Sequence, residues 1–190
     1  IVVHTDGSIH AVNTTTYVQT TIAVPGTITN PSRLNVGLTQ YGSRYVMIVS
    51  AQTNGYFIWN GTTFYSPGQT IPTIGVVPTG ISGTAIEIYA GRVWIANNAT
   101  ITFSAPGSII DFTSGSGGGN FTSSDSFLRV RYIQLLQTNG FLYLIADSSI
   151  NYISGVQTSG TPPTTTFTNQ NADPEVGTPW PSTVNTFGRN

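Results

Sequence analysis

Residues 91–107 read GRVWIANNATITFSAPG and predict two short strands joined by an Asn-Asn turn. Runs of the same kind, a glycine followed by aromatic and aliphatic residues, begin at Gly42 and Gly140. The three glycines, Gly42, Gly91 and Gly140, are spaced 49 residues apart. A second strand-like segment follows each run, at 56–59, 100–103 and 150–153. The same two-strand unit therefore occurs three times.

A repeat of about 40 to 50 residues with several β-type runs is typical of β-propeller blades. We therefore expect an all-β chain, a β-propeller-like array of four-stranded antiparallel blades with a period of about 49 residues. No window carries the apolar period of a helix, so essentially no helix is expected. The alternative is that glycines precede strands in many β proteins and that the equal spacing is chance.

The repeats divide the chain into one propeller-like domain spanning 1–190. The approximate units are 1–33 (partial), 34–85, 86–131, 132–183 and 184–190 (partial). In the second unit, strands are predicted at 86–89, 93–96, 100–103 and 108–112, followed by a glycine-rich loop at 114–120. Gly188 lies 48 residues after Gly140, where a further repeat would open, so we expect a segment of a longer chain, with the remaining blades supplied by missing sequence or by another chain.

The chain has unusually few charges. Only 7% of its 190 residues are charged, the formal net charge is -1, and the six basic residues are all arginine. A surface of Thr, Ser, Asn, Gln and Gly suits permanent assembly, because net charge is what usually keeps copies apart. The same scarcity disfavours nucleic-acid binding by a broad basic face. With 38% hydrophobic residues, the chain can still bury a core.

Several functional classes lack their sequence requirements. The chain has no cysteine, which excludes disulfides and thiolate metal sites. No apolar run reaches the roughly 18 residues that span a membrane, and the N-terminal residues lack a signal-peptide pattern. We expect no cofactor and no membrane insertion by this segment.

Histidines and a carboxylate gather only at His4, Asp6 and His10, a trio whose atoms could bind zinc or copper. Asp6-Gly7 is also a hairpin signal, and it would place His4 and His10 opposite each other on neighbouring strands. The structural interpretation is favoured, so no metal site is predicted.

The segment 115–120, GSGGGN, invites comparison with phosphate-binding loops. Such loops need a following Lys-Ser or Lys-Thr and a helix, and a dinucleotide fingerprint needs a βα unit. We interpret the segment as a flexible surface loop, which in a ring of copies could reach a neighbouring subunit.

Nothing in the sequence predicts catalysis. Glycosidases need two carboxylates about 5 to 10 Å apart, and the acidic residues here lie mostly singly in turns. We therefore expect a protein that is not an enzyme, with a glycoside-cleaving propeller as the last of three alternatives.

Arg129 and Arg131 are the predicted functional residues. The two-residue period of a strand places both guanidinium groups on one face, where they could line a polar channel or contact phosphate. Two ordinary exposed charges on a strand are the competing interpretation.

Residues 91–98 (GRVWIANN), 103–107 (FSAPG) and 111–112 (DF) resemble a blade of the packaged-DNA stabilisation or tail-hub (nozzle) proteins of short-tailed bacteriophages. In that family a blade commonly has a strand ending in Ala-Asn or Ala-Arg, a second strand ending in Ser-Ala-Pro-Gly, and a short segment ending in an aromatic residue. Residues 180–182 (WPS) and 187–190 (FGRN) resemble the opening of a later blade, so the resemblance covers 34–190. The family has no catalytic residues to carry over.

The resemblance implies a structural virion protein, a head-to-tail connector or tail-hub subunit that extends the DNA conduit and helps to retain the packaged genome. Its partners would be copies of itself in a ring, portal, adaptor and tail proteins, and double-stranded DNA in the channel. Its location would be the virion tail, after assembly in the host cytoplasm. The alternative is a carbohydrate-binding β module, a lectin propeller or tail-fibre domain, with Trp59, Trp94 or Tyr152 stacking on sugar.

Overall fold

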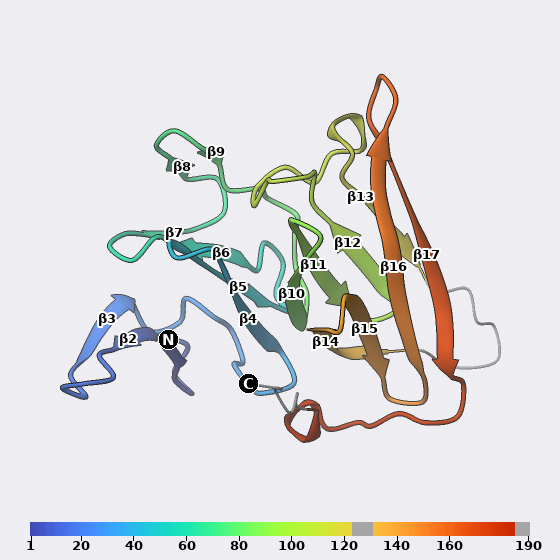
Figure 1. The fold of residues 1–190 in the computed structure, drawn as a ribbon. Coiled ribbons are helices and arrows are strands. Elements are labelled where there is room, and N and C mark those ends of the chain that lie inside the picture. The colour runs from blue at the N-terminus through green and yellow to red at the C-terminus, as the bar shows by residue number, and fades with distance from the viewer. Residues whose placement is uncertain (123–130, 185–190) are drawn as a thin grey trace.

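The computed structural model describes residues 1–122 and 131–184, and it is all-β, as the sequence predicts (Figure 1). Short 3₁₀ turns occur at η1 (Ser114–Ser116) and η2 (Pro181–Thr183). The strands are β1 (Val2–Val3), β2 (Ile9–Val12), β3 (Gln19–Ala23), β4 (Val36–Tyr41), β5 (Tyr45–Ser50), β6 (Tyr56–Trp59), β7 (Phe64–Tyr65), β8 (Thr70–Ile71), β9 (Gly75–Val76), β10 (Ala85–Tyr89), β11 (Arg92–Asn97), β12 (Thr100–Phe103), β13 (Gly119–Thr122), β14 (Tyr132–Thr138), β15 (Phe141–Ala146), β16 (Ile150–Ser159) and β17 (Thr164–Asp173).

Three of the sheets have four antiparallel strands, in the chain order β4–β7, β10–β13 and β14–β17. A three-stranded sheet, β1–β3, precedes them, and β8–β9 is a small separate hairpin. Tight turns fix the register of two of the sheets. Ala90-Gly91 and Asn139-Gly140 both have positive φ (50° and 69°, 51° and 80°), which matches the two-residue turns that join twisted antiparallel strands.

The sheets pack face to face in chain order. Successive side chains of a strand point to opposite faces, so in β5 Ile48 packs against β1–β3, whereas Met47 and Val49 pack against β10–β13. In β11 Val93 packs against β4–β7 and Trp94 against β14–β17. The two middle sheets are therefore apolar on both faces, which is why their central strands lack the usual alternation of polar and apolar residues.

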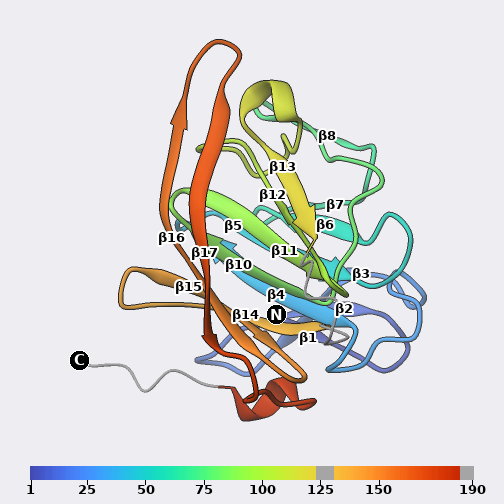
Figure 2. The ribbon, with the colours of Figure 1, turned by 90° about the vertical axis from the view of Figure 1, so that its right-hand side faces the viewer.

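The first strands of the three four-stranded sheets lie together. β10 contacts both β4 and β14, and Figure 1 shows the later strands of each sheet lying farther from this centre. The hairpin β16–β17 is the longest, with ten residues in each strand, and it extends beyond the neighbouring strands (Figure 2). No helix within 1–122 and 131–184 is long and apolar enough to cross a bilayer.

The fourth strand of the second sheet is not where the sequence predicts it. Residues 108–112 form no strand, and β13 takes that place. Ser104 Oγ donates to Ser108 O at 2.7 Å, and Tyr56 OH donates to Ile109 O at 2.6 Å. Ile109 is buried between sheets. Residues 108–112 are therefore fixed by side-chain hydrogen bonds and by burial, and not by the backbone hydrogen bonds of a strand.

The glycine-rich segment is also more ordered than a flexible surface loop. Residues 114–116 form η1, and Gly119 and Asn120 begin β13. Gly117 has φ 84° and its carbonyl oxygen accepts hydrogen bonds from the side chains of Arg92 and Thr165. The segment is a packed turn between two sheets.

Candidate functional site

A pocket of about 250 Å³ lies where the ends of the three four-stranded sheets meet. The residues before β4, at the end of β11 and before β14 converge there, together with the C-terminal segment. Its wall combines polar side chains with apolar and aromatic ones. The polar residues are Asn35, Thr84, Asn97, Asn98 and Arg131, and the others are Leu34, Ala51, Tyr132, Ile133 and Pro181. A backbone hydrogen bond joins two of the lining residues, since Tyr132 N donates to Asn98 O at 2.9 Å.

Arg131 is the charged side chain of this pocket. Its backbone N–H donates to Asp147 Oδ1 at 3.2 Å, and its Nε lies 3.9 Å from Asp147 Oδ2. The arginine side chain is 51% exposed, so the ion pair is weak and the guanidinium keeps hydrogen-bonding capacity toward solvent. The pocket can thus offer one cation and several amide groups to an anionic or polar partner.

Arg129, the second predicted residue, lies outside the described residues. The predicted pairing of Arg129 and Arg131 on one strand face therefore stays a prediction. Arg131 itself precedes the first residue of β14 and is exposed, which fits both the channel interpretation and that of an ordinary surface charge.

The structure adds a buried cation that sequence reasoning missed. Arg92 is only 2% exposed, and its Nη1 donates to Ser104 O at 2.7 Å and to Gly117 O at 2.8 Å. Its Nη2 donates to Thr165 Oγ1 at 2.8 Å and to Thr158 Oγ1. No carboxylate of the described residues lies within salt-bridge distance of it.

The Arg92 guanidinium joins three parts of the chain. It links β11 to the turn at 114–117 and to the hairpin β16–β17, and its Cζ lies 5.9 Å from the centre of the Phe103 ring. Burial lowers the pKa of Arg92, although arginine stays charged at neutral pH. The available signal was a lone arginine directly before an apolar run, VWIA, in a chain with few charges.

The His4, Asp6 and His10 trio forms a turn with internal bonds. Asp6 Oδ1 accepts hydrogen bonds from Ser8 N at 2.9 Å and Ser8 Oγ at 2.7 Å, and Ser8 Oγ lies 3.0 Å from His10 Nε2. The two imidazole rings pack 4.3 Å apart. In the described part of the chain no group of three or more His, Cys, Asp or Glu side chains is placed to hold a metal ion.

The predicted two-residue turn at Asp6-Gly7 is wrong in its register. Val2, and not His4, lies opposite His10, because His4 N donates to Ser8 O and belongs to the turn. The side chain of Asp6 bonds Ser8 two residues ahead and thereby widens the turn.

This geometry predicts that the carboxyl group of Asp6 titrates at a lower pH than an ordinary aspartate. The hydrogen bonds from the Ser8 hydroxyl and backbone lower the pKa of Asp6 in the folded chain. These hydrogen bonds therefore stabilise the fold fully above the pKa that Asp6 has in the unfolded chain. This stabilisation is lost as pH falls through the lower pKa that Asp6 has in the folded chain. We expect Ser8→Ala to raise the Asp6 pKa, as followed by NMR titration of its carboxyl carbon. An unchanged titration would contradict this assignment.

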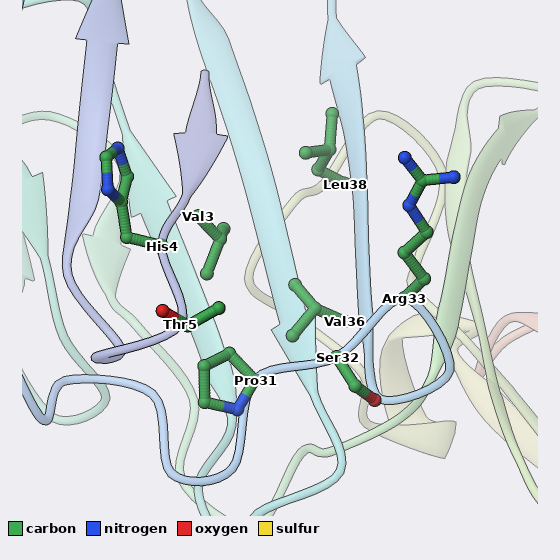
Figure 3. Close-up of a pocket in the computed structure, with 8 residues that line it drawn as sticks. All are labelled: Val3, His4, Thr5, Pro31, Ser32, Arg33, Val36 and Leu38. Carbon is green, nitrogen blue, oxygen red and sulfur yellow. The ribbon is translucent and has the colours of Figure 1, made fainter.

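A second pocket, of about 280 Å³, lies between the β1 and β4 segments. Figure 3 shows Val3, Val36 and Leu38 along it, with Arg33 on the β4 side. The lining is largely apolar, and Arg33 is exposed.

The aromatic residues considered for sugar stacking fall in different environments. Trp94 is 0% exposed, so it cannot stack on a sugar. Trp59 lines an open groove of about 590 Å³ between β1–β3 and β6, together with Asn13, Thr16 and Thr20. Tyr152 is half-buried, and its hydroxyl donates to Gln170 Oε1.

Comparison of the chain with protein-family models, with curated proteins and with solved structures finds no match.

Proposed function

We propose that this chain is a non-enzymatic structural protein of a phage virion, a tail-hub or head-to-tail connector subunit built from propeller blades. It assembles with copies of itself in a ring, extends the DNA conduit and helps to retain the packaged genome. Portal, adaptor and tail proteins are its other partners, and its location is the virion tail.

The observation that carries the proposal is the serial packing of four-stranded sheets. Three such meanders follow one another, each packed on the next by its face, and their first strands lie side by side. Blades of a propeller have this order, with the first strand innermost. We interpret the sheets β4–β7, β10–β13 and β14–β17 as blades of a partial propeller.

The surface composition supports permanent assembly. With 7% charged residues, one ion pair among the described residues and a net charge of -1, the chain has little electrostatic repulsion between copies. An interface built from such surfaces excludes water without leaving buried charges unpaired.

Electron microscopy of the purified chain and of assembled particles tests the proposal. We expect a closed ring with a central channel, and density for the same ring beneath the portal in particles. A chain that is absent from purified particles would contradict it.

Arg131 is the one of the two predicted phosphate contacts, Arg129 and Arg131, that lies in the described part of the chain. We expect Arg131→Ala to weaken binding of double-stranded DNA by the ring and to reduce its log–log salt slope by about 1, because one phosphate contact is lost. Asp147→Asn is expected to have the opposite effect on affinity, since it removes the negative partner of Arg131. Arg44→Ala, which removes an exposed arginine outside the pocket, is the matched control. Equal effects of Arg131→Ala and Arg44→Ala would contradict a specific contact.

A second function, carbohydrate binding, is favoured by the Trp59 groove. Its indole borders a wall of threonine, asparagine and aliphatic side chains, a mixture suited to a sugar ring. Titration of glycans against the wild type and Trp59→Ala separates the two functions. Saturable binding that Trp59→Ala abolishes, by a chain that forms no ring, would favour the carbohydrate-binding module.

A further inference from the structure

The outer face of β14–β17 carries an aromatic face, which we define as Phe141, Tyr143, Ile150 and Tyr152. Phe141 lies 5.2 Å from Tyr152 and 6.3 Å from Tyr143 between ring centres, and the two tyrosines lie 6.1 Å apart. The opposite face of this sheet packs Leu142, Leu144 and Ile153 against β10–β13. None of the other described sheets packs against the aromatic face.

The aromatic face occupies the position that receives the next sheet elsewhere in the chain. In β10–β13, Trp94 lies opposite Phe103, and both pack against β14–β17. In β14–β17, the residues 49 positions later, Tyr143 and Tyr152, lie opposite each other in the same way.

The preceding sheet also uses a pair of opposite residues on its second and third strands, although not at the 49-residue spacing. In β4–β7, Met47 lies opposite Ile58, and both pack against β10–β13. A pair of opposite residues on the second and third strands thus contacts the following sheet twice, and the third such pair, Tyr143 and Tyr152, belongs to the aromatic face. Continuity of the stack therefore predicts that a further sheet covers Tyr143 and Tyr152.

Charge does not protect this face from association. The strands β14, β15 and β16 contain no charged residue, and the one in β17 is Asp173 at its end. Exposed sheets of monomeric proteins usually carry charges that oppose pairing with another chain.

The sheet at the other end of the stack also has an uncovered face among the described residues. Ile9 of β1–β3 packs against β4–β7, whereas Val2, which lies opposite His10, is 42% exposed. His10 lies opposite Thr21 and packs against His4. We call Val2, His10 and Thr21 the leading face.

We infer that the aromatic face of one copy packs against the leading face of a second copy of this chain. This inference rests on the proposed ring and names the surfaces that build it. Every molecule carries both faces, so the contact is head-to-tail, and repetition closes a ring when the rotation permits. The sheet-on-sheet packing inside the chain then continues from one copy to the next.

Two complementary variants test the contact. Tyr143→Lys places a charge in the aromatic face, and Val2→Lys places one in the leading face. Each is expected to weaken self-association about a hundredfold, measured by analytical ultracentrifugation and native mass spectrometry. Mixed together, the two variants are expected to form a complex of two copies and nothing larger, because each retains one intact face.

Controls separate the interface from folding. Val76→Lys adds the same charge at an exposed site on β9 and is expected to leave association unchanged, and Tyr143→Phe should also retain it. Circular dichroism checks the fold, and Tyr152→Lys replaces Tyr143→Lys if that variant does not fold.

Three outcomes would overturn the inference: a wild-type chain that stays monomeric at high micromolar concentration, an oligomer that both lysine variants leave intact, or variants that do not pair when mixed. An intact ring in the lysine variants would contradict the contact between the aromatic face and the leading face, but not the proposed function. The proposed function is tested separately, by the presence of the chain in purified particles.

Discussion

Replacing Arg92 by alanine is expected to lower the free energy of unfolding by about 3 kcal/mol. The guanidinium donates hydrogen bonds to the carbonyl oxygens of Ser104 and Gly117 and to the hydroxyls of Thr158 and Thr165. Alanine leaves buried acceptors without this donor and opens a cavity beside Phe103. Because these contacts join β11 to the hairpin β16–β17, their loss also loosens the hairpin.

Denaturant unfolding followed by circular dichroism measures the effect of Arg92→Ala. Arg92→Lys is expected to recover part of the loss, since an ammonium can bond some of the acceptors but lacks the planar fork of donors. Arg44→Ala removes an exposed arginine and is the control, with an expected change within about 0.5 kcal/mol. If Arg92→Ala and Arg44→Ala unfold at the same denaturant concentration, the buried hydrogen bonds contribute no net stability.

The sequence predicts the three four-stranded regions because their strands are marked by local signals. Glycines at tight turns and runs such as VWIA fix where β11 and β15 lie, and the antiparallel pairing follows from short connections. The lack of a strand at 108–112 could not be predicted, because the carbonyl of Ile109 accepts a hydrogen bond from the Tyr56 hydroxyl, 53 residues earlier in the chain. A contact between distant parts of the chain leaves no periodic signal.

The candidate site was less predictable than the fold. Arg131 was found because two arginines lie two positions apart in the sequence, a pattern visible without the structure. Arg92 was missed because isolated arginines are usually exposed, and only packing reveals that carbonyl and hydroxyl groups from three segments surround it. The aromatic face needed the register of paired strands, since Tyr143 and Tyr152 look like ordinary core residues in sequence.

Replacing Trp94 by alanine is expected to lower the free energy of unfolding by about 4 kcal/mol, the largest effect of any variant considered. Trp94 is 0% exposed, and its ring centre lies 4.9 Å from that of Phe103 and 5.7 Å from that of Phe167. Its Nε1 donates to Tyr89 O at 3.0 Å. Alanine removes the side chain that fills the space between β10–β13 and β14–β17, so the two sheets lose much of their shared core.

Trp180 provides the matched control for Trp94, because it is 61% exposed and makes no ring contact with another described aromatic residue. We expect Trp180→Ala to change stability by less than about 0.5 kcal/mol and Trp94→Phe to fall between the two alanine variants. Denaturant midpoints and the near-ultraviolet circular dichroism of the folded variants report these differences. Equal midpoints for Trp94→Ala and Trp180→Ala would show that the two sheets do not depend on this core, and would remove the basis for extending their packing to a second copy.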